Sequence, residues 1–367
     1  MKKRAAGGTG ASAVRAPEVE TTRYRGRSGP ARKTATSYDV AQLAGVSQSA
    51  VSRCFRPDGS ISDEMRNRVI AAARRLGYAP DAIARSLTTR RSNLVGVIIS
   101  NLTNLYYPEV LSELNARCAE RNVHLLLFTI QNESDVDRVL GSVWQYRLDG
   151  VIAAARLSVA QVKEFEQRRV ALVFYNRFMH ERGVNAVCCD QAGGARLMID
   201  ALVASGHRRF GLIGGPKDSA VGVERIEGCI ARLQHHGVKS HVTIDGDYTY
   251  KGGFGAFELV KRKLGKTPDA IIAAADVMAL GCLDAIRHVH KLSVPDDVSV
   301  LGFDGVEPGT WASYALATIR QPVQDMAAAA VSLLLESVEN PSRQPEKRLF
   351  SGVLVPGASA RITPADK

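Results

Sequence analysis

The 367-residue chain lacks any run of about 18 apolar residues, so no membrane span is expected. Residues 1–35 are basic but lack the apolar segment of a secretory signal peptide. None of the six cysteines forms a C-x-x-C pair, and most lie in apolar stretches, which favours buried, reduced thiols over a disulfide framework. These absences predict a cytoplasmic protein.

Catalytic and cofactor motifs are also missing. The segment "LGKTPD" resembles the end of a phosphate-binding loop, but the first glycine of that loop would fall at Val260. His288 and His290 are two residues apart and face different sides of a helix, so they make a poor metal pair. No Ser–His–Asp set or pair of carboxylates stands out. We therefore expect no catalytic residue, no metal and no cofactor, and hence no enzyme.

Positive charge is concentrated at one end of the chain. Residues 1–92 hold 18 Lys and Arg against 7 Asp and Glu, which accounts for the whole net charge of +11. A concentrated positive field favours a polyanion, most often nucleic acid. A basic tail that only aids solubility is the alternative. Residues 1–35 show no helical or strand period, and we expect them to form a disordered basic leader.

Three short helices are predicted after this leader. Ser37 can cap a first helix that Gly45 ends, and Ser47 can cap a second through Cys54. Ser62 can cap a third, longer helix. Its inward face, read from helical spacing, is formed by Met65, Val69, Ala72 and Leu76.

The first two helices have the anatomy of a helix-turn-helix. Gly45 makes the turn, and Val46 and Val51 face inward. Such a second helix fits the major groove of DNA, where Gln and Arg side chains reach base edges. An ordinary helical hairpin with a solvated face is the alternative. The exposed face of the second helix carries Gln48, Ser49, Ser52 and Arg53.

From residue 94 onward, apolar strands alternate with helices. This pattern predicts an α/β fold with parallel sheets covered on both faces, arranged as two doubly wound lobes. Ligands bind such sheets at the carboxyl ends of the strands. Cys188 and Cys189 would point to opposite faces if their segment were a strand. The strands expected are 94–100, 123–130, 149–155, 170–176, 210–215, 270–276 and 298–304.

Residues 36–361 resemble the LacI/GalR family of bacterial transcription regulators. The resemblance is carried by "TSYDVAQLAGVSQSAVSR", "ISDEMRNRVIAAARRLGYAPDAIARSL", "SGHRRFGLIGGP", "VERIEGC", "DVMALGCLDAI", "VPDDVSVLGFD" and "ATIRQP". It implies a repressor that acts as a homodimer on a pseudo-palindromic, double-stranded operator. It also implies a two-lobed effector domain, like that of periplasmic sugar-binding proteins, which binds a small molecule such as a sugar or sugar derivative.

The resemblance also divides the chain into regions. After the leader at 1–35, it implies an all-α headpiece at 36–80, a hinge helix and linker at 81–92, and an effector and dimerisation domain at 93–367. Lobe one would comprise 93–190 and 322–341, and lobe two would comprise 191–321 and 342–367.

Matching positions assign roles in DNA binding. Gln48 and Ser49 would choose bases, and Arg53 would make a largely shared base contact. The hinge helix "DAIARSL" contains Ala84 and Leu87, and Leu87 would enter the minor groove as a wedge that kinks the duplex. Phosphate contacts would come from Thr36, Ser47 and Ser52.

Matching positions also assign the effector cleft. Arg225 begins an R-x-x-G motif, and Asp276 and Asp304 each end a predicted lobe-two strand, so we expect their carboxylates to project into the cleft. A solute-binding protein with the same lobes but no DNA role is the alternative, and the headpiece argues against it. The expected effector contacts are Tyr106, Tyr107, Asn176, Arg177, Arg225, Asp276 and Asp304.

Overall fold

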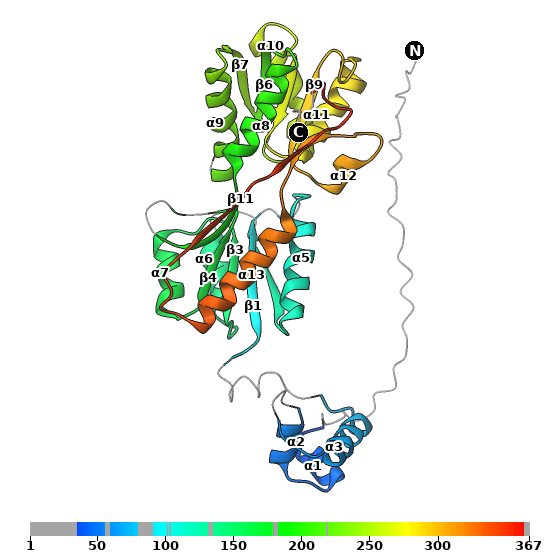
Figure 1. Cartoon of the computed structure of the whole chain (residues 1–367), viewed down its shortest axis with the longest axis vertical. Coiled ribbons are helices and arrows are strands. Elements are labelled where there is room, and N and C mark those ends of the chain that lie inside the picture. The colour runs from blue at the N-terminus through cyan, green and yellow to red at the C-terminus, as the bar shows by residue number, and fades with distance from the viewer. Residues whose placement is uncertain are drawn as a thin grey trace, which may run out of the picture. The chain divides into compact units, whose positions relative to one another are not determined.

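A computed structural model describes residues 35–55, 59–79, 91–100, 102, 104–130, 135–177, 179, 183–217 and 219–362. The chain divides into two compact units, Met1–Asp81 and Ala82–Lys367 (Figure 1). The predicted hinge helix, with Ala84 and Leu87, and the leader up to residue 34 lie outside the described residues.

The first unit contains the three predicted helices, α1 (Ser37–Ala44), α2 (Gln48–Cys54) and α3 (Asp63–Leu76). The caps at Ser47 and Ser62 are confirmed, and Gly45 takes the left-handed φ of 64° that the turn needs. The cap of α1 lies one residue earlier than predicted, at Thr36 rather than at Ser37. Thr36 is the capping residue, because its hydroxyl accepts a hydrogen bond from the Asp39 amide while the Asp39 carboxylate accepts a hydrogen bond from the Thr36 amide.

A small apolar core holds these helices together. Val51, Val69 and Ala72 are buried as predicted, whereas Leu76 is 37% exposed and was wrongly placed on the inward face. The side chains of the buried core are Val40, Ala41, Val51, Cys54, Val69, Ala72 and Ala73.

The second unit begins with a parallel sheet of six strands in the order β11-β5-β4-β3-β1-β2. Its strands are β1 (Leu94–Ser100), β2 (His124–Ile130), β3 (Gly150–Ala154), β4 (Ala171–Tyr175), β5 (Asn185–Cys189) and β11 (Lys347–Phe350). The helices of this lobe are α5 (Tyr107–Glu120), α6 (Val136–Val143), α7 (Val159–Gln167) and α13 (Val323–Glu339). Cys188 and Cys189 belong to separate apolar clusters, which confirms that they point to opposite faces of β5.

A second six-stranded sheet has the order β12-β10-β9-β8-β6-β7, and only β12 runs antiparallel to its neighbour. Its strands are β6 (Arg209–Gly214), β7 (Ser240–Asp245), β8 (Ala270–Ala273), β9 (Ser299–Asp304), β10 (Ala317–Arg320) and β12 (Val353–Val355). Its helices are α8 (Gln191–Ala204), α9 (Ala220–His235), α10 (Tyr250–Leu264), α11 (Asp276–Asp284) and α12 (Glu307–Thr310). Helix α11 continues as a short π-helix at Ala285–Val289.

The chain passes between the two sheets at three places, after β5, after β10 and after β11 (Figure 1). The two-lobed parallel α/β architecture is confirmed, as are all seven predicted strands. One boundary differs from the expected one. Strand β11 pairs with β5 in the first sheet, so the last passage lies between Phe350 and Val353 rather than at residue 342.

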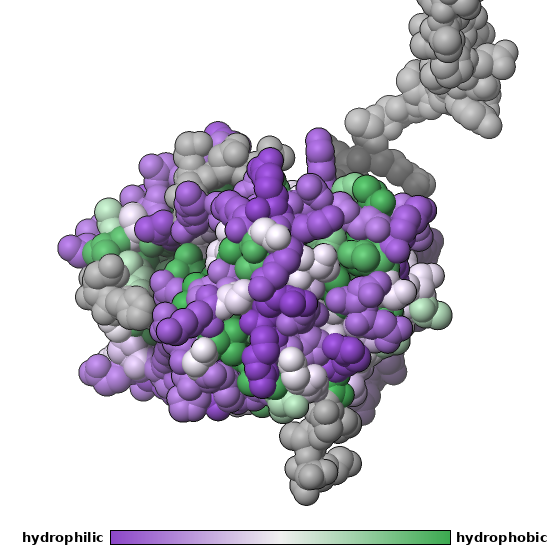
Figure 2. Space-filling view, turned by 90° about the horizontal axis from the view of Figure 1, so that it is seen from above, coloured by the Kyte–Doolittle hydropathy of each residue, from purple (hydrophilic) through white to green (hydrophobic). Residues whose placement is uncertain are grey.

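One face of the molecule is mainly polar (Figure 2). Figure 2 shows hydrophilic residues over most of one face, with hydrophobic residues in small patches between them. Scattered exposed apolar side chains are ordinary for a folded protein. No helix in the described part of the chain is long and apolar enough to cross a membrane.

Candidate functional sites

Helix α2 presents a polar face whose direction is fixed by its buried face. Ala50, Val51 and Cys54 are buried, which leaves Gln48 and Arg53 exposed on the other side. Long amide and guanidinium side chains on such a face can form paired hydrogen bonds with adenine and guanine edges. The helix therefore has the residues and orientation needed to read bases.

Several residues predicted to contact DNA form hydrogen bonds within the headpiece. The Ser47 hydroxyl accepts the Ala50 amide and lies 2.9 Å from the Ser49 hydroxyl. The Gln48 amide nitrogen donates to the Ser37 hydroxyl at 3.3 Å, which links α2 to α1. Ser49 is exposed, and Ser52 is half-buried. Thr36 is exposed and occupied in its own capping box.

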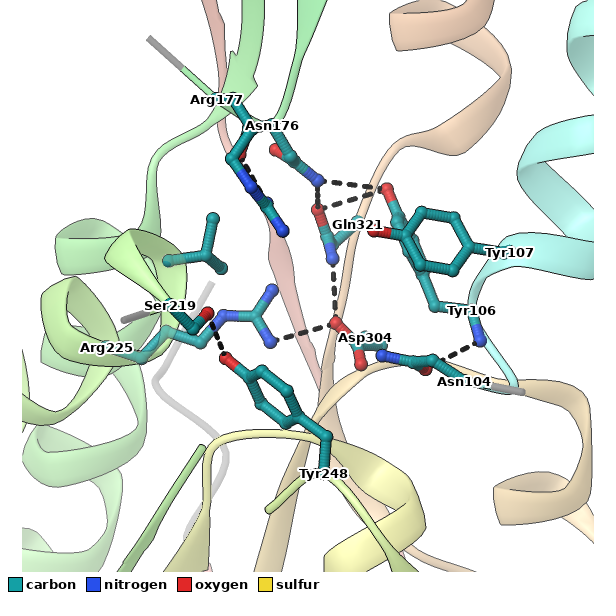
Figure 3. Close-up of a pocket in the computed structure, with 11 residues that line it drawn as sticks. Asn104, Tyr106, Tyr107, Asn176, Arg177, Ser219, Arg225, Tyr248, Asp304 and Gln321 are labelled. Carbon is teal, nitrogen blue, oxygen red and sulfur yellow. Dashed lines mark hydrogen bonds and ion pairs between the residues drawn. The ribbon is translucent and has the colours of Figure 1, made fainter. Parts of the chain in front are cut away.

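The second unit contains a cleft between its lobes with a cavity of about 40 Å³ (Figure 3). Six of the seven predicted effector contacts line it: Tyr106, Tyr107, Asn176, Arg177, Arg225 and Asp304. The sequence did not indicate five further lining residues: Asn104, Ser219, Val221, Tyr248 and Gln321.

Gln321 is the centre of a hydrogen-bond network that joins the lobes (Figure 3). Its side-chain oxygen accepts from the Tyr106 hydroxyl at 3.2 Å and from the Asn176 amide nitrogen at 2.8 Å. Its nitrogen donates to Asp304 at 2.8 Å. Tyr106 and Asn176 belong to the first lobe and Asp304 to the second, so a movement of the lobes must change these contacts.

Arg225 and Asp304 form a buried ion pair in the floor of the cleft. The guanidinium lies 2.9 Å from the carboxylate, and each side chain is only 4% exposed. Arg225 also donates to the Gln191 side chain at 2.7 Å and lies over the Phe303 ring at 3.7 Å. Burial opposes the charged form of Arg225, but attraction from Asp304 prevails and raises the pKa of the guanidinium. Burial raises the pKa of Asp304, and Arg225 counteracts that rise.

Three cleft residues have backbone conformations that side chains rarely adopt. Asn176, Tyr248 and Asp304 have φ values of 50°, 52° and 129°. Asn176 directly follows β4, Tyr248 follows β7, and Asp304 is the last residue of β9. Such conformations cost roughly 1–3 kcal/mol each and cluster at functional sites. Here they turn side chains at the carboxyl ends of the strands into the cleft.

Asp276 does not lie in the cleft, so the prediction for this residue is wrong. Its side chain is fully buried, and one carboxylate oxygen accepts the amides of Gly305 and Val306 at 2.7 and 2.8 Å. The other oxygen accepts from the Thr318 hydroxyl at 2.6 Å. Burial raises the pKa of Asp276 to about 7, and repulsion from Asp304 adds to the rise. Asp276 thus fixes the loop that follows Asp304.

These features define a class of protein: a DNA-binding regulator with a helix-turn-helix headpiece and a two-lobed ligand-binding unit. Residues 36–81 match the model of the family "Bacterial regulatory proteins, lacI family", and residues 199–360 match that of the periplasmic binding protein-like domain. The ribose operon repressor of Escherichia coli is 30% identical over 332 residues, which cover 89% of this chain and 100% of that protein.

Solved structures agree with this relationship. The lac repressor dimer bound to operator and the anti-inducer ONPF matches with a TM-score of 0.80 and 26% identity, over 89% of this chain and 99% of that one. The complex of the transcriptional regulator CelR with cellobiose matches with a TM-score of 0.68 and 27% identity, over 89% of this chain and 100% of that one. The chain belongs to the LacI family of bacterial regulatory proteins. It is a DNA-binding transcriptional regulator and not an enzyme.

Proposed function

We propose that this regulator represses transcription as a cytoplasmic homodimer bound to a pseudo-palindromic operator. Gln48, Ser49 and Arg53 contact bases, while Thr36, Ser47 and Ser52 contact phosphates. Leu87, outside the described residues, is the wedge of the hinge helix. The exposed face of α2 supports the base contacts, and the lac repressor structure named above is a dimer on its operator. A dimer of headpieces accounts for a palindrome, because half-site spacing follows protein symmetry.

The cleft binds a hydroxylated small molecule, a sugar or sugar derivative. The network around Gln321 supports this proposal, because its donors and acceptors are those that sugar hydroxyls can replace. Tyrosine rings in the same wall provide surfaces for the apolar faces of a sugar ring. The ribose operon repressor and the CelR–cellobiose complex carry sugars in their names.

The ligand acts by a population shift between arrangements of the lobes. It can change operator affinity only by the difference between its affinities for the two arrangements. The coupling is reciprocal, so operator must change effector affinity by the same factor, typically within about 5–150-fold.

Selection of bound fragments from genomic DNA, followed by footprinting, tests this proposal. The full-length protein is expected to protect one pseudo-palindrome of about two helical turns. Replacing Gln48 and Ser49 together by alanine should remove the sequence preference while the protein stays folded. Sequence-blind binding by the unmodified protein, with and without a panel of sugars, would contradict the proposal. Addition of the effector then shows whether it releases or recruits the repressor.

A further inference from the structure

The charges in the cleft wall do not balance. The cavity is lined by two guanidiniums, Arg177 and Arg225, and by one carboxylate, Asp304. Arg225 is paired with Asp304 at 2.9 Å. Arg177 donates to the main-chain oxygen of Asn176 at 2.7 Å, and no carboxylate of the described residues lies within ion-pair distance of it. One positive charge in the cleft therefore has no counterion from the described part of the protein.

The surroundings of Arg177 add to this positive field. Figure 3 shows the guanidiniums of Arg177 and Arg225 pointing into the same space. The amino-terminal end of α9 reaches the cleft, because its cap Ser219 and its residue Val221 both line the cavity. The amino terminus of a helix carries a partial positive charge, and the first turn of α9 has no acidic residue to offset it.

An adjoining cavity of about 120 Å³ continues from the first past Arg177. It adds Lys347 to the lining, together with two acids, Asp190 and Glu224. Asp190 is already occupied, since it accepts the Gly193 amide at 2.8 Å and lies 3.6 Å from Arg196. Neither Asp190 nor Glu224 lies within ion-pair distance of Arg177, so the second cavity adds space beside this guanidinium but no direct counterion.

We infer that the effector is acidic: a hydroxylated body that bears a carboxylate or phosphate group held by Arg177. This inference rests on the proposed function of the cleft. Closure of the lobes over a neutral ligand would bury a guanidinium without a counterion, which is unfavourable. An acidic group supplies that counterion and accepts paired, charge-assisted hydrogen bonds from the planar guanidinium. The wider cavity beside Arg177 gives the group room.

Binding of matched neutral and acidic sugars tests the inference. The probes are pentoses and hexoses, each beside its aldonate, its uronate and its phosphate ester, titrated into the full-length protein by calorimetry. Because hydrogen bonds to charged groups are the stronger ones, the best acidic probe should bind at least about tenfold tighter than its neutral parent. Carboxylate and phosphate members of the panel identify which acid is used. A tightest binder that is neutral, or a panel in which no acid binds, overturns the inference.

Variants assign the effect to Arg177. Arg177→Met should lower the affinity for the acidic probe at least about tenfold more than it lowers the affinity for the neutral parent. Arg177→Lys should restore part of the preference for the acidic probe, because lysine carries the positive charge but lacks the planar guanidinium that donates paired hydrogen bonds. Arg138→Met, which removes a guanidinium 73% exposed on α6, controls for net charge and should change nothing. Equal loss for both probes in Arg177→Met contradicts a role in acid recognition.

Failure of the inference and failure of the proposed function give different results. If a neutral sugar binds the cleft and changes operator affinity, the regulator is effector-controlled but its effector is not acidic. If no probe binds and no operator is recognised, the proposed function itself is wrong.

Discussion

Replacement of Arg225 by methionine should destabilise the two-lobed unit, even though Arg225 lines the cleft between the lobes. Methionine fills a similar volume but leaves the Asp304 carboxylate, 4% exposed, without its partner at 2.9 Å. Removing one partner of a buried ion pair typically costs about 3–5 kcal/mol, because the remaining charge is uncompensated. That is a large share of the roughly 5–15 kcal/mol by which proteins are stable.

The double variant separates the ion pair from the other contacts of Arg225. In Arg225→Met with Asp304→Asn, no unpaired charge remains, and asparagine can still accept from Gln321. The double variant should be less destabilised than the sum of the two single ones, with a coupling of about 2 kcal/mol, within the range seen for residues in contact. The bonds from Arg225 to Gln191 and Ala274 are lost in both backgrounds and cancel.

Urea unfolding followed by tryptophan fluorescence measures these free energies. The chain has two tryptophans, Trp144 and Trp311, and both lie in the unit from residue 82 onward, so the signal reports that unit alone. Strictly additive single variants, or an Arg225→Met variant within 1 kcal/mol of the unmodified protein, would refute the buried-pair argument. The folded variant should also bind operator without responding to effector.

Three further predictions concern other parts of the chain. Gly45→Ala should destabilise the headpiece by about 1 kcal/mol through backbone strain alone, since φ is 64° and an added Cβ meets no atom within 4 Å; thermal melting of the headpiece signal checks this. Because the pKa of Asp276 is raised in the folded state, the folded protein binds the Asp276 proton more tightly than the unfolded chain does, and the stability that this protonation contributes falls as pH rises towards 7. Asp276→Asn should weaken that pH dependence in urea titrations and keep the effector response. Leu87→Ala should weaken operator binding while leaving nonspecific, salt-sensitive DNA binding unchanged in gel-shift assays, and equal loss on both DNAs would reject the wedge.

Much of the fold could be predicted because its strands are buried on both faces. Strand β8 is buried at all four positions, and its unbroken apolar run is visible in the sequence. Strand β7 escaped prediction because four of its six residues are only half-buried and it contains Ser240, His241 and Thr243. Because β7 was not predicted, its carboxyl end was not recognised as a place for ligand contacts, and Tyr248, which follows it, was not identified.

The error at Asp276 has a different cause. The general rule places acids that follow strands in the cleft, but Asp276 opens a helix, and its carboxylate turns inward to two backbone amides and a hydroxyl. Those partners lie in the loop after β9 and in β10, about 30 and 42 residues away along the chain. Local sequence patterns do not show that the amides of that loop need a side chain as their hydrogen-bond acceptor. The cap of α1, by contrast, was visible: Thr36 and Asp39 have the spacing of a capping box.

Gln321 was missed because it lies in a passage between lobes, where neither strand nor helix periodicity applies, and that position explains its importance. It directly follows β10 of the second lobe and precedes α13 of the first, and it bonds to side chains of both. Any rotation of one lobe against the other must lengthen at least one of these bonds. A bound ligand that offers replacement partners lowers the cost of that rotation, and a ligand that adds bonds to the present arrangement raises it. The same residue can therefore support release or recruitment of the repressor, and the sign is set by where the ligand places its own hydroxyl and acidic groups.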